Sequence, residues 1–96
     1  MYKIQTIIDI LEDLAPQSAA APWDNVGLLL GDKKRSVSSV VLTLDLDQKS
    51  LDLAKELEAQ LIVCHHPPIF PTIDRLTTDN PLSGRLLEAA EEGIAV

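Results

Sequence analysis

The two histidines of this chain, His65 and His66, are adjacent, and they are its residues best suited to chemistry. They follow the apolar run Leu61–Cys64, and Pro67 and Pro68 then hold the backbone extended and remove two amide donors. In open α/β sheets, ligands bind in the crevice beyond the carboxyl ends of the strands. The position of the pair therefore indicates ligands for a divalent metal at the end of a buried strand.

Adjacent histidines differ from a chelating pair on a helix because successive side chains on an extended backbone point in different directions. Such a pair is better suited to serve two metal ions, one each. Metals about 4 Å apart can activate a shared water and stabilise charge on an attacked centre. Imidazole accepts zinc, iron, manganese or nickel. The alternative is structural, with one ring capping the sheet edge and the other bonding a loop carbonyl.

Two neighbouring polar residues could belong to the same site. Asp45 ends the preceding candidate strand, so its carboxylate can reach the crevice as a catalytic group or as a group that orients a metal ligand. Its structural alternative is a turn or helix-entry role. Cys64 could offer a thiolate, but burial is the favoured interpretation because free cysteine is among the most buried residue types. The candidate set is therefore Asp45 as the catalytic residue, with His65 and His66 as metal ligands.

Apolar spacing predicts the elements that would position these residues in the first half of the chain. A helix is expected over residues 4–14, stopped by Ala15 before Pro16. Residues 17–26 suggest a loop, since they contain small residues, a second proline and Trp-Asp-Asn. Short strands are expected over 26–30 and 37–44. The second strand would carry the candidate aspartate to the edge of the sheet.

In the second half, Asp47 can cap a helix. Its inward positions would be Leu51, Leu53, Ala54 and Leu57. The run Leu61–Cys64 shows no alternation, which suits a strand buried on both faces, as in a parallel sheet. Asn80 and Pro81 would begin a third helix with Gly93 as its C-terminal cap, and the last three residues would start another strand.

The order of elements from residue 37 is strand, helix, strand, helix, strand, which predicts an α/β fold. A parallel or mixed sheet would carry helices on its faces. Residues 1–96 are expected to form a single α/β unit. The sequence ends at strand-like residues directly after a helix, so we expect this unit to be the amino-terminal part of a longer chain.

The composition limits the classes of partner and the compartments that can be expected for this chain. Eight basic residues against fifteen acidic ones give a net charge of -7, which disfavours nucleic acid, and the basic cluster 33–35 is expected to be a solvated turn. One cysteine excludes an internal disulfide and favours a reducing compartment. We see no signal peptide and no apolar segment long enough to span a bilayer, so a cytoplasmic location without a membrane partner is expected.

Several pieces of the sequence resemble one family in order and in spacing. They are Ala15-Pro16, the run Trp23-Asp24-Asn25-Val26-Gly27-Leu28-Leu29 with Gly31-Asp32, the strand ending at Asp45, and His65-His66-Pro67-Pro68-Ile69-Phe70. The chain resembles the amino-terminal part of the GTP cyclohydrolase 1 type 2 homolog family, also called the Nif-three-like proteins. The resemblance covers essentially the whole chain.

The resemblance implies a larger Nif-three-like fold in which α/β subunits form a toroidal homo-hexamer and bind two divalent metals. The adjacent histidines are ligands in that family, which carries over to His65 and His66. The remaining family ligands are an aspartate shortly after a His-Thr-Asn-like run, and a histidine and a glutamate near the carboxyl terminus. These three are expected beyond Val96.

Two functions from different classes follow. The first is a metal-dependent hydrolase acting on a small, nucleotide-like substrate, with Asp45 orienting the water or a ligand; a GTP cyclohydrolase reaction is implied by resemblance only. The second is a non-catalytic, metal-binding oligomeric scaffold or protein-interaction module. A purely structural role for the histidines is a third alternative. Metal analysis of the purified protein distinguishes the third from the first two.

Overall fold

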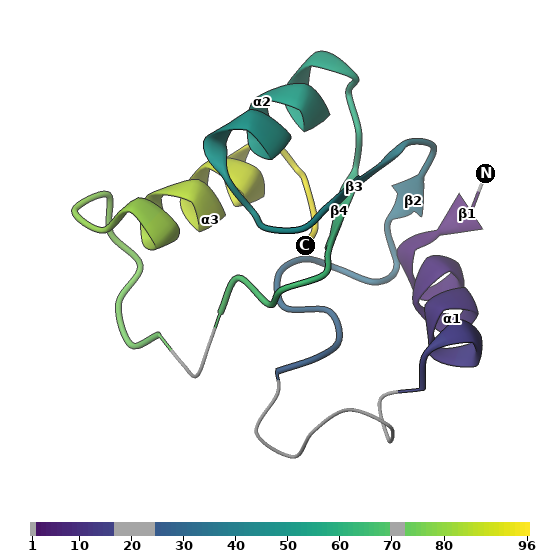
Figure 1. Cartoon of the computed structure of the whole chain (residues 1–96). Coiled ribbons are helices and arrows are strands. Elements are labelled where there is room, and N and C mark those ends of the chain that lie inside the picture. Colours follow the sequence, from purple (N-terminus) through teal and green to yellow (C-terminus); the bar gives the residue numbers. More distant parts are fainter. Residues whose placement is uncertain (1, 17–24, 70–72) are drawn as a thin grey trace.

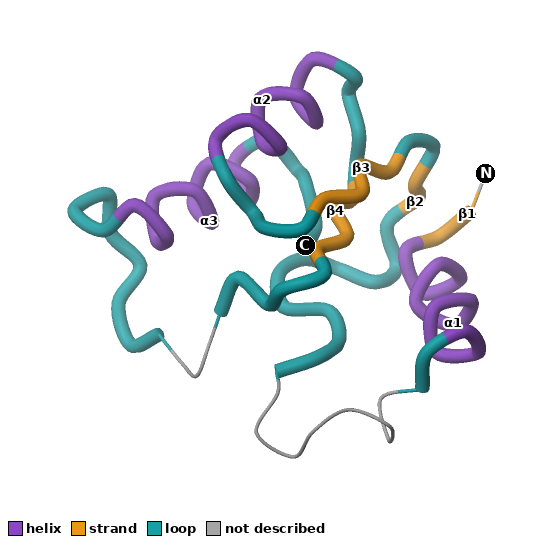
Figure 2. The backbone as a smooth tube through the Cα atoms, viewed as in Figure 1, coloured by secondary structure: helices purple, strands orange, loops and turns teal. Residues whose placement is uncertain are grey.

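A computed structural model describes residues 2–16, 25–69 and 73–96. The elements in chain order are β1 (Tyr2–Lys3), α1 (Ile4–Leu14), β2 (Ser36–Val37), β3 (Val40–Thr43), α2 (Gln48–Glu56), β4 (Leu61–Cys64) and α3 (Pro81–Glu91). Figures 1 and 2 show helices on both sides of the central strands, which confirms the predicted α/β class. Across these ranges, no helix has the length and apolarity needed to cross a bilayer.

The central feature is a parallel pair of strands joined by a helical crossover. β3 and β4 pair from Val40 opposite Leu61 to Thr43 opposite Cys64, and α2 connects them. Ala95 adds an isolated parallel bridge to Leu61. β1 and β2 form a separate antiparallel pair. The predicted mixture of parallel and antiparallel pairing is therefore present, and its parallel part leads to the candidate site.

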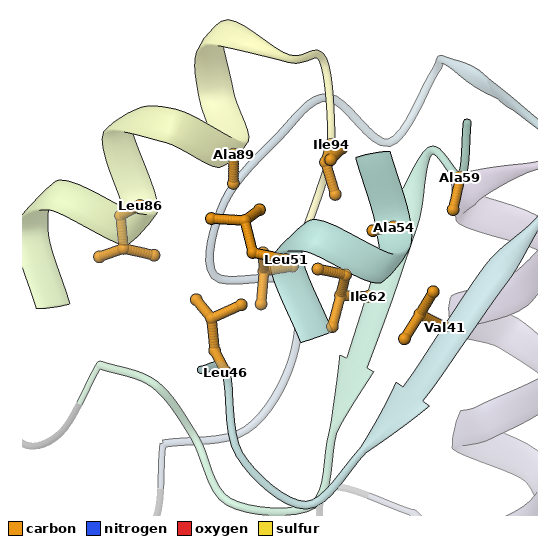
Figure 3. Close-up of a cluster of buried hydrophobic side chains, with 10 residues drawn as sticks. Val41, Leu46, Leu51, Ala54, Ala59, Ile62, Leu86, Ala89 and Ile94 are labelled. Carbon is orange, nitrogen blue, oxygen red and sulfur yellow. The ribbon is translucent and has the colours of Figure 1, made fainter. Parts of the chain in front are cut away.

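Side chains of β4 pack on both of its faces. Ile62 joins a core formed with α2 and α3 (Figure 3), and Leu61 joins a second cluster with Ile4 of α1 and Val37. The first core comprises Val41, Leu46, Leu51, Ala54, Ala59, Ile62, Leu86, Ala89, Ile94 and Val96. Burying a Leu, Ile or Val side chain stabilises a fold by about 1.5–3 kcal/mol. The first half of β4 is thus covered on both faces, as its unbroken apolar run predicted.

The helix starts follow their sequence signals. The Asp47 carboxylate accepts a hydrogen bond from the Ser50 amide at 2.8 Å, and the Asp47 amide donates to the Ser50 hydroxyl at 3.0 Å. This reciprocal cap begins α2. At α3, the Leu82 amide donates to the Asn80 side chain at 2.9 Å, and Pro81 is the first helical residue. Both predicted starts are confirmed.

The cap of α2 makes stability depend on pH. Hydrogen bonding with the Ser50 amide, and to a smaller extent with the Ser50 hydroxyl, holds the pKa of Asp47 below its ordinary value. When folding lowers the pKa of a carboxyl group, its ionised form stabilises the folded state. This stabilisation is complete above the pKa of the unfolded state, and it is lost as the pH falls through the lower pKa of the folded state. Asn at this position still caps but does not titrate. We expect the free energy of unfolding of Asp47→Asn to fall less than that of the wild type as the pH falls from about 5 to about 2. Urea unfolding at several pH values measures this, and an equal fall in the two proteins would contradict the expectation.

The strand predicted over 26–30 is wrong. Residues 25–30 form no strand, although the amides of Leu29 and Leu30 donate to the Val96 carbonyl at 2.9 and 3.0 Å, and the Val96 amide donates to the Leu30 carbonyl at 2.9 Å. On the far side of Leu30, Gly31 turns the chain with a φ of +120°. A Cβ at Gly31 would lie 2.6 Å from the Ala95 Cβ, so only glycine allows this approach.

The strand predicted over 37–44 is interrupted. The Gln60 side-chain oxygen accepts hydrogen bonds from the amides of Ser38 and Ser39 at 2.7 and 3.1 Å, and from the Ser38 hydroxyl at 3.1 Å. These amides therefore bind a side chain instead of a neighbouring strand. The break lets β2 pair with β1 while β3 pairs with β4.

The predicted inward face of α2 is only half right. Leu51 and Ala54 are completely buried, but Leu53 is 44% exposed and Leu57 is 55% exposed. Leu51 and Ala54 are three positions apart and share one face, whereas Leu53 and Leu57 share another. Leu57 also closes the helix, since the next residue, Glu58, has a positive φ of 54°. The predicted burial of Leu57 is therefore wrong, because this residue lies at the end of α2.

Candidate metal centre

The carboxyl ends of β3 and β4 lie side by side and bring the candidate residues together. Beyond the two strands, the His65 amide donates to the Thr43 carbonyl at 3.0 Å, and the His66 amide donates to the Leu44 carbonyl at 2.8 Å. The parallel ladder therefore continues into the histidine pair. It places His66 beside Asp45, the second residue after β3.

Asp45 and His66 make a direct side-chain contact. His66 Nδ1 lies 2.9 Å from Asp45 Oδ1, and the side chains are 60% and 64% exposed, respectively. An ionised carboxylate can only accept a hydrogen bond, so Nδ1 would donate to it, and in a neutral ring this leaves the lone pair on Nε2. The Thr43 hydroxyl donates to the Asp45 carbonyl at 2.9 Å and restrains the turn that carries this carboxylate.

The His65 ring has a different orientation and different surroundings from the His66 ring. The two ring centroids are 5.0 Å apart and the ring planes are tilted by 55°. His65 borders a cavity of about 280 Å³ between α1 and the end of β4, which His66 does not line. Much of the cavity wall is apolar and includes Ile7, Ile8, Leu28, Val63 and Pro67. One histidine thus borders an apolar cavity and the other an exposed carboxylate.

This donor set fits part of a divalent-metal site. Two exposed imidazoles at a strand end are ligands that zinc, iron, manganese and nickel accept. Within residues 2–16, 25–69 and 73–96, however, no group of three or more histidine, cysteine or acidic side chains is close enough to hold a metal. A structural zinc site uses four ligands. A metal site built on the two histidines would therefore need donors from elsewhere.

Cys64 is half-buried beside the site and is not a thiolate at neutral pH. Burial raises the pKa of the Cys64 thiol to about 11, and the Asp45 and Asp47 carboxylates add to the effect. Metal ligation requires the thiolate. Packing of Cys64 against the first core agrees with the structural interpretation of this residue.

The raised pKa predicts slow alkylation of Cys64. A rise from the ordinary value of 9.0 to about 11 lowers the thiolate fraction at pH 8 by about 100-fold. With metals chelated, iodoacetamide should react about 100-fold more slowly with the folded protein than with the protein in urea, as followed by mass spectrometry. Equal rates in the two states would contradict the assigned environment.

One contact near the site was missed from the sequence. The Asn25 side-chain amide donates to the Ile69 carbonyl at 2.6 Å and ties the segment before Gly27 to the segment after the histidines. The family-like run contains Asn25, but no sequence pattern identifies its partner. Trp23, Asp24 and Phe70, which belong to the same resemblance, lie outside the described residues.

Comparison with known proteins identifies the family. The profile of the Duf34/NIF3 (NGG1p interacting factor 3) family matches residues 2–96, and the chain belongs to this family. It is 36% identical over 92 residues to a GTP cyclohydrolase 1 type 2 homolog of Clostridium perfringens, covering 96% of this chain and 35% of the relative. It is 41% identical over 76 residues to NIF3-like protein 1 of Drosophila melanogaster, covering 78% of this chain and 26% of that protein.

Solved structures agree with this assignment. The crystal structure of Staphylococcus aureus protein SA1388 superposes with a TM-score of 0.93 at 32% identity, over 98% of this chain and 27% of that one. A Bacillus cereus protein related to NIF3 gives the same TM-score at 28% identity, over 99% of this chain and 26% of that one. The chain therefore has the fold of one part of these proteins and spans about a third or less of their length.

Proposed function

We propose that this chain supplies the two-histidine part of a divalent-metal site, and that the site serves hydrolysis of a small molecule. The contact between His66 Nδ1 and Asp45 Oδ1 is the observation that carries the proposal. Imidazoles that bind metals commonly donate their other nitrogen's proton to a carboxylate. The contact lies at the carboxyl ends of parallel strands, where α/β proteins bind their ligands.

The residues of the chain have separable tasks in this proposal. His65 and His66 would each offer one ring nitrogen, and two ions are expected because the rings diverge. A divalent ion, when bound, acts as a Lewis acid and makes water a stronger nucleophile near neutral pH. The cavity beside His65 would hold the apolar part of a substrate against its apolar wall. Several relatives are named GTP cyclohydrolase 1 type 2 homologs, which supports a nucleotide-like substrate.

Activity and metal content test this proposal together. The protein at its natural length is loaded with zinc, manganese or iron, its bound metal is measured by mass spectrometry, and it is screened against phosphoesters and purine rings. We expect metal-dependent turnover that His65→Ala abolishes. Asp74→Asn, which removes an exposed carboxylate outside the site, should leave turnover unchanged. Turnover that survives His65→Ala, or a wild-type protein that takes up no metal, would overturn the proposal.

A further inference from the structure

We infer that Asp45 is a positioning residue for His66, which it holds in the tautomer that carries the proton on Nδ1 and leaves the Nε2 lone pair for a metal. The tautomer itself follows from the contacts of the chain; its use rests on the proposed metal-binding function. The distance of 2.9 Å between Nδ1 and Oδ1 is within the range of a strong hydrogen bond to a carboxylate. Which imidazole nitrogen carries the proton is set by the hydrogen bond that the ring makes.

The structural roles that the Asp45 side chain could have, capping α2 and holding the turn, are filled by other groups. An aspartate between a strand and a helix commonly caps the helix, but here Asp47 caps α2 together with Ser50. The turn itself is held through the Asp45 main chain, whose carbonyl accepts from the Thr43 hydroxyl. The Asp45 carboxylate is therefore not the cap of α2, and in the described parts of the chain it contacts His66.

The same geometry makes the two histidines inequivalent. In the part of the chain that the structure describes, the His65 ring has no hydrogen-bond partner, whereas the His66 ring is bound to a carboxylate. A carboxylate partner raises the basicity of a ligating imidazole and fixes its orientation. His66 would therefore bind its ion more tightly than His65 binds the other, and loss of Asp45 would weaken the His66 side alone.

The tautomer test needs no metal and no activity. The full chain is labelled with ¹⁵N-histidine and freed of metal by a chelator, and its ring signals are assigned with His65→Gln and His66→Gln. At about pH 8, where most histidines are neutral, we expect His66 to show a protonated Nδ1 and an unprotonated Nε2. Asp45→Ala should convert this signature to a mixture of tautomers, while the His65 signals stay unchanged. Asp45→Asn keeps an oxygen acceptor and should retain most of the signature.

Metal affinity provides the second readout. By competition with a chromophoric chelator, Asp45→Ala should weaken Zn²⁺ binding about 10–100-fold, Asp45→Asn should restore part of the loss, and Asp74→Asn should change nothing. Thermal unfolding of each variant shows that the fold is kept. A wild-type protein with the proton on Nε2 of His66, or an Asp45→Ala protein with unaltered tautomer, would overturn the role of Asp45. A wild-type protein that binds no Zn²⁺ would overturn the proposed function instead, and the tautomer would still decide the role of Asp45.

Discussion

His66→Ala is expected to weaken Zn²⁺ binding by more than about 100-fold, because it removes a ligand itself, whereas loss of an outer partner of a ligand costs about 10–100-fold. Among the described residues, no group of three or more histidine, cysteine or acidic side chains is arranged to hold a metal in its place. The affinity is measured at constant pH by competition with a chromophoric chelator, using the protein at its natural length.

The control for this experiment is Asp74→Asn, an exposed loop substitution that should bind Zn²⁺ as the wild type does. The His66 side chain is 60% exposed, so its removal should change the unfolding free energy by no more than about 0.5 kcal/mol. Unfolding in urea checks that expectation. A folded His66→Ala protein with wild-type affinity would show that this imidazole is not a ligand.

Leu51→Ala is expected to lower the free energy of unfolding by about 2–5 kcal/mol, since it deletes a fully buried side chain and leaves a cavity. Leu51 lies in the core between α2, α3 and the strands (Figure 3). Proteins of ordinary stability unfold with about 5–15 kcal/mol. This single change therefore removes a large part of the total, and urea unfolding followed by circular dichroism measures it.

Leu53→Ala is the matched control for Leu51→Ala, because both substitutions make the same chemical change within α2. Leu53 is 44% exposed, so its truncation should cost less than about 1 kcal/mol. Helix propensity changes equally in the two variants, and the difference between them isolates burial in the core. Equal losses of stability would contradict the packing described for α2.

The helices could be predicted from the sequence because their signals are local. Asp47 with Ser50, and Asn80 with Pro81, satisfy the first amides of α2 and α3 through side chains close in sequence. The same holds for the end of α1 before Pro16. Each of these boundaries depends on residues within one helical turn.

The strands could be predicted less well because their boundaries depend on distant residues. The break between β2 and β3 follows from three hydrogen bonds to Gln60, and no pattern around Ser38 indicates that partner. Residues 26–30 look like a strand by composition, but their backbone bonds to Val96 come from Leu29 and Leu30 and no strand forms. Apolar runs predict where a strand can form, and tertiary contacts decide how far it extends.

The candidate site was predictable in its location and not in its geometry. Adjacent histidines after an apolar run place the site at a strand end, and Asp45 follows the neighbouring strand. The hydrogen bond between Asp45 and His66 depends on the register of β3 against β4, which the sequence does not state. The divergence of His65 toward an apolar cavity likewise depends on α1, a helix distant in sequence.

Asp45 follows β3 and His66 follows β4, so their contact limits where residues can be inserted into the chain or deleted from it. Sliding β3 by one residue against β4 would turn its side chains to the opposite faces of the sheet and part the carboxylate from the imidazole. An inserted or deleted residue between Thr43 and Asp45 would part that pair in the same way. We therefore expect evolution to accept residue exchanges in this turn more readily than insertions or deletions, and protein engineers to find the turn intolerant of grafted loops.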